Sequence, residues 1–253
     1  MNILNELVDA IDQRRAVVCA TVIDSRRSVP RRPGSKMLVY ADGSLSGTIG
    51  GGEMEARVVS ECREVIASRR SRCVTYSLLD PGAGDPGVCG GEVELYLEPH
   101  MPQTTIYVIG IGHVGTAVIE LAGWLGYRVI AWDDRTELTE HVEGAEAILS
   151  GTIADAVKAQ PIDEFTRVVM VTRNVDLDTQ ILPVLLETPA PYIGLMGSGR
   201  RWETTRARLV AEGASEEALD RVHSPIGIEI AAETPAEIAV SILAEVIGHE
   251  RGG

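Results

Sequence analysis

The first hundred residues carry short hydrophobic runs whose spacing switches between the helical and the strand period. Apolar residues recur every three to four positions across residues 3–11, which predicts an amphipathic helix. Continuous apolar runs at residues 17–24, 72–80 and 93–99 predict strands, and residues 53–68 predict a second helix. Asp42 and Gly43 separate two further apolar runs and predict a hairpin turn. We therefore expect a small α+β domain over residues 1–100.

The pattern changes after a proline-containing linker near residues 98–104. Strands and helices then alternate, up to a last helix that opens with Thr234 as its N-cap and Pro235 at its first position. Such alternation predicts right-handed crossovers, and hence a parallel sheet with helices on both faces. The fold class we predict is α/β, with a Rossmann-type doubly wound sheet over residues 104–253 preceded by the smaller domain.

The composition is that of an ordinary globular protein, with 253 residues, 45% hydrophobic and 24% charged. The formal net charge of −14 disfavours nucleic acid and anionic membranes as partners. No apolar run reaches transmembrane length, and acidic residues interrupt the N-terminal apolar positions, unlike in a signal peptide. We therefore expect a cytoplasmic protein with reduced cysteines. Cys19, Cys62 and Cys73 lie in apolar or helical runs and are predicted to fill the core.

Three glycines, Gly110, Gly112 and Gly115, end the first strand of the second domain and open its first helix. In a dinucleotide-binding loop the first glycine permits a tight turn, the second lets backbone approach a pyrophosphate, and the third lets the helix pack closely. The helix N-terminus offers free N–H groups and a partial positive charge to an anion. The loop predicts the fold, whereas its function is either dinucleotide binding or that of an inherited scaffold with a reused site.

Asp133 lies 21 residues beyond Gly112, at the end of the second strand of this domain. A carboxylate at this position is expected to accept hydrogen bonds from a ribose 2′-hydroxyl. Backed by Asp134, it would repel a 2′-phosphate, which favours NAD over NADP if either binds. His113, inside the loop, either faces the ligand or fills a surface position.

A second candidate anion site is the turn of Gly197, Ser198 and Gly199, which leads into a helix carrying Arg200 and Arg201. Free N–H groups, a hydroxyl and guanidinium groups suit a phosphate. The alternative is an ordinary strand-to-helix turn with solvated arginines.

The triple glycine (Gly50, Gly51 and Gly52) also precedes a helix. Three consecutive glycines cost conformational entropy that a plain helix cap would not require, so we expect them to contact a ligand or partner. Glu53 and Glu55 follow in the first helical turn, where carboxylates complement the helix dipole.

Cys89 lies in a glycine-rich loop, where its thiol is either a functional sulfur acceptor, metal ligand or nucleophile, or a small loop residue without a role. A cationic run stands out in so acidic a chain, and it either grips a phosphorylated cofactor or forms a solvated loop. Its members are Arg26, Arg27, Arg31, Arg32 and Lys36.

Several of these segments together resemble the XdhC/CoxI family, accessory proteins of molybdenum hydroxylases such as xanthine dehydrogenase. The segments are SVPRRPGSKMLV, GTIGGGEMEARV, VCGGEVELYLEP, VIGIGHVGTAV, VIAWDDR, PYIGLMGSGRR and SPIGIEIAAETPAEIAVSILAEVI. The likeness spans nearly the whole chain, and the order of the blocks makes it specific. Some relatives have cysteine where this chain has Glu53.

The resemblance implies a protein that binds molybdenum cofactor as cargo, protects it during sulfuration and hands it to an apo-enzyme. By the same resemblance, Cys89 would contact the metal or its sulfur, Gly50, Gly51 and Gly52 would line the pterin or phosphate site, and the glycine loop with His113 would bind a nucleotide-type group. The implied partners are a molybdenum hydroxylase apo-enzyme and a cysteine desulfurase. We also expect a homodimer, because the small first domain needs apolar cover.

The alternative function is an NAD(P)-dependent oxidoreductase that acts on a small molecule in a cleft between the two domains. Its catalytic group would be Cys89, His113, Glu53 or Glu233. The sequence offers no Tyr-xxx-Lys pair for that chemistry, so whether the protein is an enzyme stays open.

Overall fold

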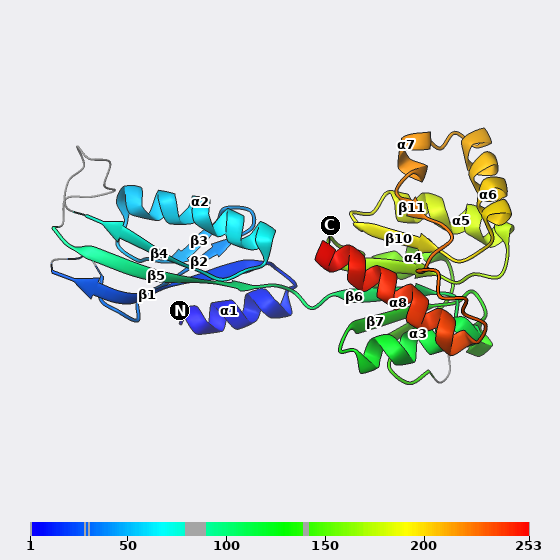
Figure 1. The fold of residues 1–253 in the computed structure, drawn as a ribbon, viewed down its shortest axis with the longest axis horizontal. Helices are drawn as coiled ribbons and strands as arrows, with labels where there is room; N and C mark the ends of the chain where they lie inside the picture. The colour runs from blue at the N-terminus through cyan, green and yellow to red at the C-terminus, as the bar shows by residue number, and fades with distance from the viewer. Residues whose placement is uncertain (1, 28, 30, 79–89, 139–141, 253) are drawn as a thin grey trace. The chain divides into compact units, whose positions relative to one another are not determined.

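The computed structural model describes residues 2–27, 29, 31–78, 90–138 and 142–252 (Figure 1). The chain divides into two compact units, Met1–Pro102 and Gln103–Gly253. Each unit has its own hydrophobic core. In the described part of the chain, no helix is both long and apolar enough to cross a membrane.

The first unit is built on a five-stranded antiparallel sheet with the strand order β3-β2-β1-β5-β4. Alternation along β1 and β2 sends one set of side chains to α2 and the other to α1, so the helices lie on opposite faces. The elements in chain order are α1 (Ile3–Asp12), β1 (Val17–Arg26), β2 (Lys36–Tyr40), β3 (Leu45–Gly47), α2 (Gly52–Ser68), β4 (Arg72–Ser77) and β5 (Glu92–His100).

The hairpin predicted around Asp42 and Gly43 is confirmed, because β2 and β3 pair antiparallel on either side of that turn. Asp42 accepts the N–H and the hydroxyl hydrogen of Ser44, and Gly43 adopts φ +83°. Local turn chemistry therefore sets this register.

The prediction that Cys73 fills the core is wrong, whereas Cys19 and Cys62 are buried as expected. Residues alternate along β4, so Val74 and Tyr76 pack against the core under α2 while Cys73 is exposed on the other face. Burial raises the pKa of the Cys62 thiol to about 12, with Glu61 adding to the effect. Cys73 is the exposed thiol of the described residues.

The second unit is a six-stranded parallel sheet with the order β11-β10-β9-β6-β7-β8, as the alternating pattern predicts. The strand order reverses between β6 and β9, which is where doubly wound sheets bind ligands at their carboxyl edge. The elements in chain order are β6 (Thr105–Ile109), α3 (His113–Trp124), β7 (Arg128–Trp132), η2 (Thr136–Leu138), β8 (Ala147–Leu149), α4 (Ile153–Ala159), β9 (Thr166–Met170), α5 (Val175–Leu186), β10 (Tyr192–Leu195), α6 (Gly199–Ala211), α7 (Glu216–Leu219), β11 (Val222–His223) and α8 (Pro235–Gly252).

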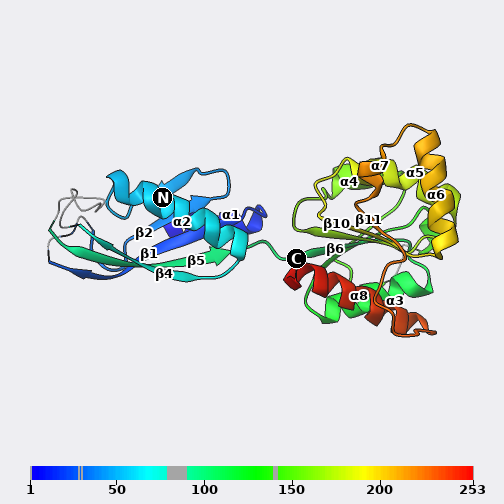
Figure 2. The same cartoon turned by 45° about the horizontal axis from the view of Figure 1, so that its top comes forward.

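Two helix layers cover this sheet (Figure 2). One core cluster joins the sheet to α3 and α8, and the other joins it to α4, α5 and α6. The start of α8 is capped as predicted, because Thr234 accepts the Glu237 N–H and Glu237 in turn accepts the N–H of Thr234. Helices bury both faces of these parallel strands. This explains the near-continuous apolar runs in this half of the sequence.

Candidate functional site

The glycine loop (residues 110–115) turns from β6 into α3 at the carboxyl edge of the sheet. Gly110 has φ +104°, and a Cβ there would lie 2.8 Å from the carbonyl oxygen of Val171. A Cβ at Gly115 would lie 1.8 Å from the carbonyl oxygen of Gly110. Gly112 differs, because its φ is −80° and the space where a Cβ would lie is open. Packing therefore requires the first and third glycines, whereas the second keeps room for an outside group.

The N-terminus of α3 faces this open space and has no side-chain cap. Gly112 is the N-cap and makes no side-chain cap hydrogen bond. Within the described ranges, the N–H groups of Gly112, His113 and Val114 have no hydrogen-bond acceptor. Unsatisfied N–H groups at a helix N-terminus attract anions. His113 is exposed at the first position of this helix, and its ring contacts no polar partner among the described residues.

Asp133, at the end of β7, turns its carboxylate toward its own chain. Its side chain is 2% exposed and accepts the Ile111 N–H at 2.7 Å. Arg135 donates to both carboxylate oxygens, from Nε at 2.9 Å and from a terminal nitrogen at 3.0 Å. Burial opposes the charged form, but the hydrogen bonds from Arg135 and Ile111 outweigh it and lower the pKa of Asp133 to about 2. The carboxylate therefore braces the loop.

Asp134 is also engaged, since Arg173 donates to both of its oxygens at 2.7 Å. Each of the two acidic residues is thus paired with an arginine, so their negative charges are neutralised at this edge of the site. Paired in this way, Asp133 and Asp134 are not bare carboxylates and no longer favour NAD over NADP. A pocket of about 150 Å³ lies beside these pairs, lined by the glycine loop, the ends of β7 and β9, Arg135 and Arg173.

The turn predicted as a second anion site lies at the same edge of the sheet. Arg201 donates to the buried carboxylate of Asp178 at 2.8 Å through two nitrogens, and to the carbonyl oxygen and hydroxyl of Thr172. Thr172 also lines the pocket, so this network joins the turn to the pocket. Arg200 is exposed, and its guanidinium has no polar partner in the part of the chain that the structure describes. The two neighbouring arginines therefore have separate roles, one structural and one open to solvent.

Ser198 caps α6 by accepting the Arg201 N–H at 3.3 Å. Gly197 is confined, because a Cβ there would lie 2.8 Å from the Arg201 side chain, whereas Gly199 has open space. The residues of this turn and the glycine loop, far apart in sequence, thus lie at the same edge of the sheet.

In the first unit, a side-chain carboxylate of the same chain occupies the turn formed by the triple glycine. One oxygen of Glu55 accepts the N–H groups of Ile49, Gly50 and Gly51 at 2.9–3.2 Å, and the hydroxyl hydrogen of Thr48 at 2.6 Å. Burial opposes the charge of Glu55, but the Thr48 and backbone hydrogen bonds lower its pKa. Glu55 thus does more than complement the helix dipole: it occupies the anion position of the turn.

The remaining predicted residues are dispersed. Glu53 is exposed and pairs with Arg57 at 2.6 Å on the same helix face. Gly51 and Gly52 have positive φ and open space at the Cβ position. Cys89 lies outside the described residues.

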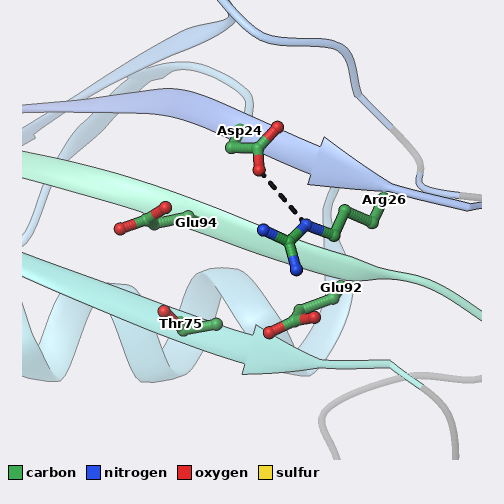
Figure 3. Close-up of a pocket in the computed structure, with 5 residues that line it drawn as sticks. All are labelled: Asp24, Arg26, Thr75, Glu92 and Glu94. Carbon is green, nitrogen blue, oxygen red and sulfur yellow. Dashed lines mark ion pairs between the residues drawn. The ribbon is translucent and has the colours of Figure 1, made fainter.

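The cationic run is partly tied to the first sheet. Arg26 pairs with Asp24 at 3.5 Å, and Lys36 donates to Thr21 at 2.8 Å. Figure 3 shows Asp24 and Arg26 with Thr75, Glu92 and Glu94 around a pocket of about 100 Å³. Among the described residues, no group of histidine, cysteine and acidic side chains is arranged to hold a metal ion.

Five features of this region were not predicted from the sequence: Arg135, Arg173, Thr172, Asp178 and the cap formed by Glu55. Arg135 could have been found, because it follows the acidic pair at a strand end. Thr172 and Asp178 are six residues apart across a loop and a helix start, and sequence spacing alone does not predict their contact with Arg201.

Comparison with known proteins places this arrangement in a family. The XdhC Rossmann domain matches residues 106–246, and the XdhC and CoxI family matches residues 10–77. A solved structure from Bacillus halodurans, described as a xanthine dehydrogenase, shares the fold with a TM-score of 0.52 at 22% identity, over 99% of this chain and 96% of that one.

Three curated relatives extend the likeness. The uncharacterized Escherichia coli (strain K12) protein YqeB is 34% identical over 98% of this chain, which spans 46% of that protein's length. The molybdenum cofactor insertion chaperone PaoD of Escherichia coli (strain K12) is 24% identical, covering 96% of this chain and 86% of PaoD. A probable xanthine dehydrogenase subunit from Bacillus subtilis (strain 168) is 28% identical over 60% of this chain and 45% of that protein. The chain belongs to the XdhC and CoxI family, with an XdhC Rossmann domain as its second unit.

Proposed function

We propose that this chain binds molybdenum cofactor as cargo and helps to insert it into a molybdenum hydroxylase such as xanthine dehydrogenase. The observation that carries the proposal is the open N-terminus of α3 beside a pocket at the reversal of strand order. Support also comes from family membership and from the relative named as a molybdenum cofactor insertion chaperone.

The cargo carries a phosphate at one end, and the site suits that group. The uncapped N–H groups of α3 provide donors and partial positive charge, and Gly112 leaves room for close approach. Arg135 and Arg173 balance the two neighbouring carboxylates, so the site does not repel an anion through unpaired acidic groups. His113, Ser198 and Arg200 lie at the same carboxyl edge of the sheet, and we assign them to the rim of the site.

We assign further contacts with the cargo to the first unit, independently of the site on the second. Because Glu55 occupies the donors of the triple glycine, this turn is better suited to the flat face of a pterin than to its phosphate. Cys89 is the proposed contact to the metal or its terminal sulfur, since a thiolate is a soft ligand.

The later steps follow from the role of the cargo. A cysteine desulfurase would supply the terminal sulfur while the chaperone shields the cofactor, and the apo-hydroxylase would then receive it in the cytoplasm. We propose that the working form is a homodimer.

A nicotinamide-dependent oxidoreductase is the second candidate, favoured by the strand order and the glycine loop. Both oxygens of Asp133 already accept hydrogen bonds from the chain, so a ribose would have to share them with Arg135. Titration calorimetry with NAD and NADP tests this candidate, and absence of binding heat for both would eliminate it.

The test of the chaperone role measures the pterin that the protein carries from a host that makes molybdenum cofactor. We expect near-stoichiometric fluorescent pterin after oxidation of the wild type, and at least about a tenfold loss of affinity, roughly 1.4 kcal/mol, for Cys89→Ser. Cys73→Ser, which removes an exposed thiol from a sheet face, is the matched control and should keep its pterin. Absence of pterin from the wild type would contradict the proposal.

A further inference from the structure

One half of the sheet face under α1 bears no helix of the first unit in the residues that the structure describes. The core beneath α1 takes its strand residues from β1 and β2. A strand spacing of about 4.8 Å and a helix diameter of about 10 Å mean that one helix covers two strands. The part of this face over β5 and β4, here the open half, therefore has the width of one more helix. Its side chains alternate with core residues on the opposite face, and they are Cys73, Thr75, Glu92, Glu94, Tyr96 and Glu98.

The flank of α1 beside the open half is apolar. Leu4, Val8 and Ile11 are 50%, 55% and 40% exposed, and their spacings of four and three residues form one stripe. A turn of about 100° per residue places Glu6 on the other flank, where it accepts the hydroxyl hydrogen of Ser46 on β3. Because the strand order is β3-β2-β1-β5, the stripe borders the β5 side. An exposed apolar stripe in a chain of net charge −14 indicates a protein interface.

The floor of the open half continues this interface with an aromatic ring. Tyr96 on β5 is half-buried, and the strand register places Cys73 on one side of it and Thr21 on the other. Cys73 is exposed, and Lys36 donates to Thr21 at 2.8 Å. A tyrosine provides a broad apolar surface with one polar end, which suits a contact between proteins.

The end of the open half beyond Tyr96 is acidic. A depression of about 100 Å³ lies there between β1, β5 and β4, and its lining is drawn in Figure 3. Asp24 is paired with Arg26 at 3.5 Å, whereas the carboxylates of Glu92 and Glu94 have no ion-pair partner among the described residues. Two negative charges therefore remain unpaired around the depression. A lysine or arginine side chain is the complementary occupant.

We propose that a positively charged amphipathic helix of a partner protein docks beside α1, over β5 and β4. Its apolar side packs against the stripe of Leu4, Val8 and Ile11 and against Tyr96, and one of its cationic side chains enters the acidic depression. Helices dock in grooves through anchors at this spacing. The proposal goes beyond the proposed function and does not depend on the cargo.

The dimensions and charge of the open half select this occupant. β5 has nine residues and is therefore about 30 Å long, which is the length of a helix of about 20 residues. The unpaired carboxylates of Glu92 and Glu94 repel an anionic membrane surface and attract a basic partner.

The experiment uses the exposed Cys73 thiol as a reporter of whether the floor is covered. The full chain reacts with N-ethylmaleimide, and mass spectrometry follows modification of Cys73. The probe is a synthetic 20-residue helical peptide of leucine and lysine, with the leucines along one side. At saturation we expect this peptide to slow the modification by about tenfold or more, because a covered thiol is inaccessible. A peptide with glutamate in place of lysine should leave the rate unchanged.

Variants locate the binding surface, with the affinity measured by fluorescence anisotropy of the labelled basic peptide. Val8→Glu in the stripe and Glu94→Lys in the depression should each raise the dissociation constant by about tenfold or more. The matched controls are Val210→Glu and Glu203→Lys, which make the same charge changes at exposed positions of α6. Attraction by net charge alone would instead make Val8→Glu bind the basic peptide more tightly.

Equal effects of a variant and its control, or a rate of Cys73 modification unchanged by the basic peptide, would overturn the proposal. So would protection of Cys73 in the free chain relative to the urea-unfolded chain. Protection at every concentration would mean that another part of the chain covers the face, and protection only at high concentration that a second copy does. Circular dichroism establishes that the variants fold, and Ile11→Ser replaces Val8→Glu should the latter not fold. Pterin content of the same samples reads the chaperone role separately.

Discussion

Both units contain a glycine-rich turn that leads into a helix and contacts a carboxylate of the same chain, but the two turns differ in what remains free. In the first unit Glu55 accepts the N–H groups of residues 49–51. In the second unit Asp133 accepts only the Ile111 N–H from the glycine loop, and the first N–H groups of α3 have no acceptor within the described ranges. One turn is thus internally satisfied, whereas the other can still receive an anion.

The comparison teaches that a glycine pattern alone does not distinguish a filled turn from an open one. Both patterns read as close-approach loops in the sequence, and both precede a helix. The two turns differ because the position of the carboxylate determines how many backbone N–H donors it satisfies.

The largest predicted effect separates the glycines of the open loop. Gly115→Ala should destabilise the protein by about 3 kcal/mol or more, because its Cβ would overlap the Gly110 carbonyl oxygen. Gly112→Ala should change the free energy of unfolding by less than about 0.5 kcal/mol, since the space is open. Urea denaturation measures both. Equal losses for the two variants would contradict the separate roles of these glycines.

Next in size is the effect of Asp133 on stability against pH. Burial opposes its charge, yet the hydrogen bonds lower its pKa from 3.8 to about 2, so its contribution is present above about pH 4 and lost as the pH falls toward 2. Asp133→Asn should lose about 2 kcal/mol at neutral pH, and the difference from wild type should narrow below about pH 4. Unfolding curves at several pH values measure this difference. A gap that stays constant with pH would show that the charge does not brace the loop.

The smallest predicted effect concerns the filled turn. Glu55→Ala should cost about 1 kcal/mol, because the N–H groups of residues 49–51 lose their acceptor while water can still reach this half-buried site. Inorganic phosphate should then raise the melting temperature of the variant more than that of the wild type. Thermal melts with and without phosphate test this, and Glu53→Ala on the same helix is the control. No difference between the two variants would mean that Glu55 does not occupy the turn.

Much of the fold follows from the sequence, because the apolar periods and turn residues are local signals. The strand alternation after residue 104, the hairpin at Asp42 and the cap at Thr234 were all readable this way. The exposure of Cys73 was not readable. A strand with one face on the core and one in solvent exposes every second residue, and a single short apolar run does not specify which residues face the core.

The site was predictable only in part. The glycine loop and Asp133 follow a fixed spacing, so their meeting at one edge was readable from the sequence. Of the partners that decide their electrostatics, Arg135 lies two residues from Asp133 and was readable, whereas Arg173 reaches Asp134 from the end of another strand. Long-range pairing of this kind has no local sequence signal.

The central claim is that the open end of α3 binds the anionic end of the cargo, and one measurement tests it most directly. Pterin content is compared between wild type, Gly112→Asp and Ala207→Asp, each purified from a host that makes molybdenum cofactor. Ala207 is exposed on α6, so it adds the same charge away from the loop. The account predicts loss of at least nine-tenths of the pterin, which from near-stoichiometric occupancy is about a hundredfold loss of affinity, for Gly112→Asp alone. Wild-type pterin content in a folded Gly112→Asp protein would contradict it.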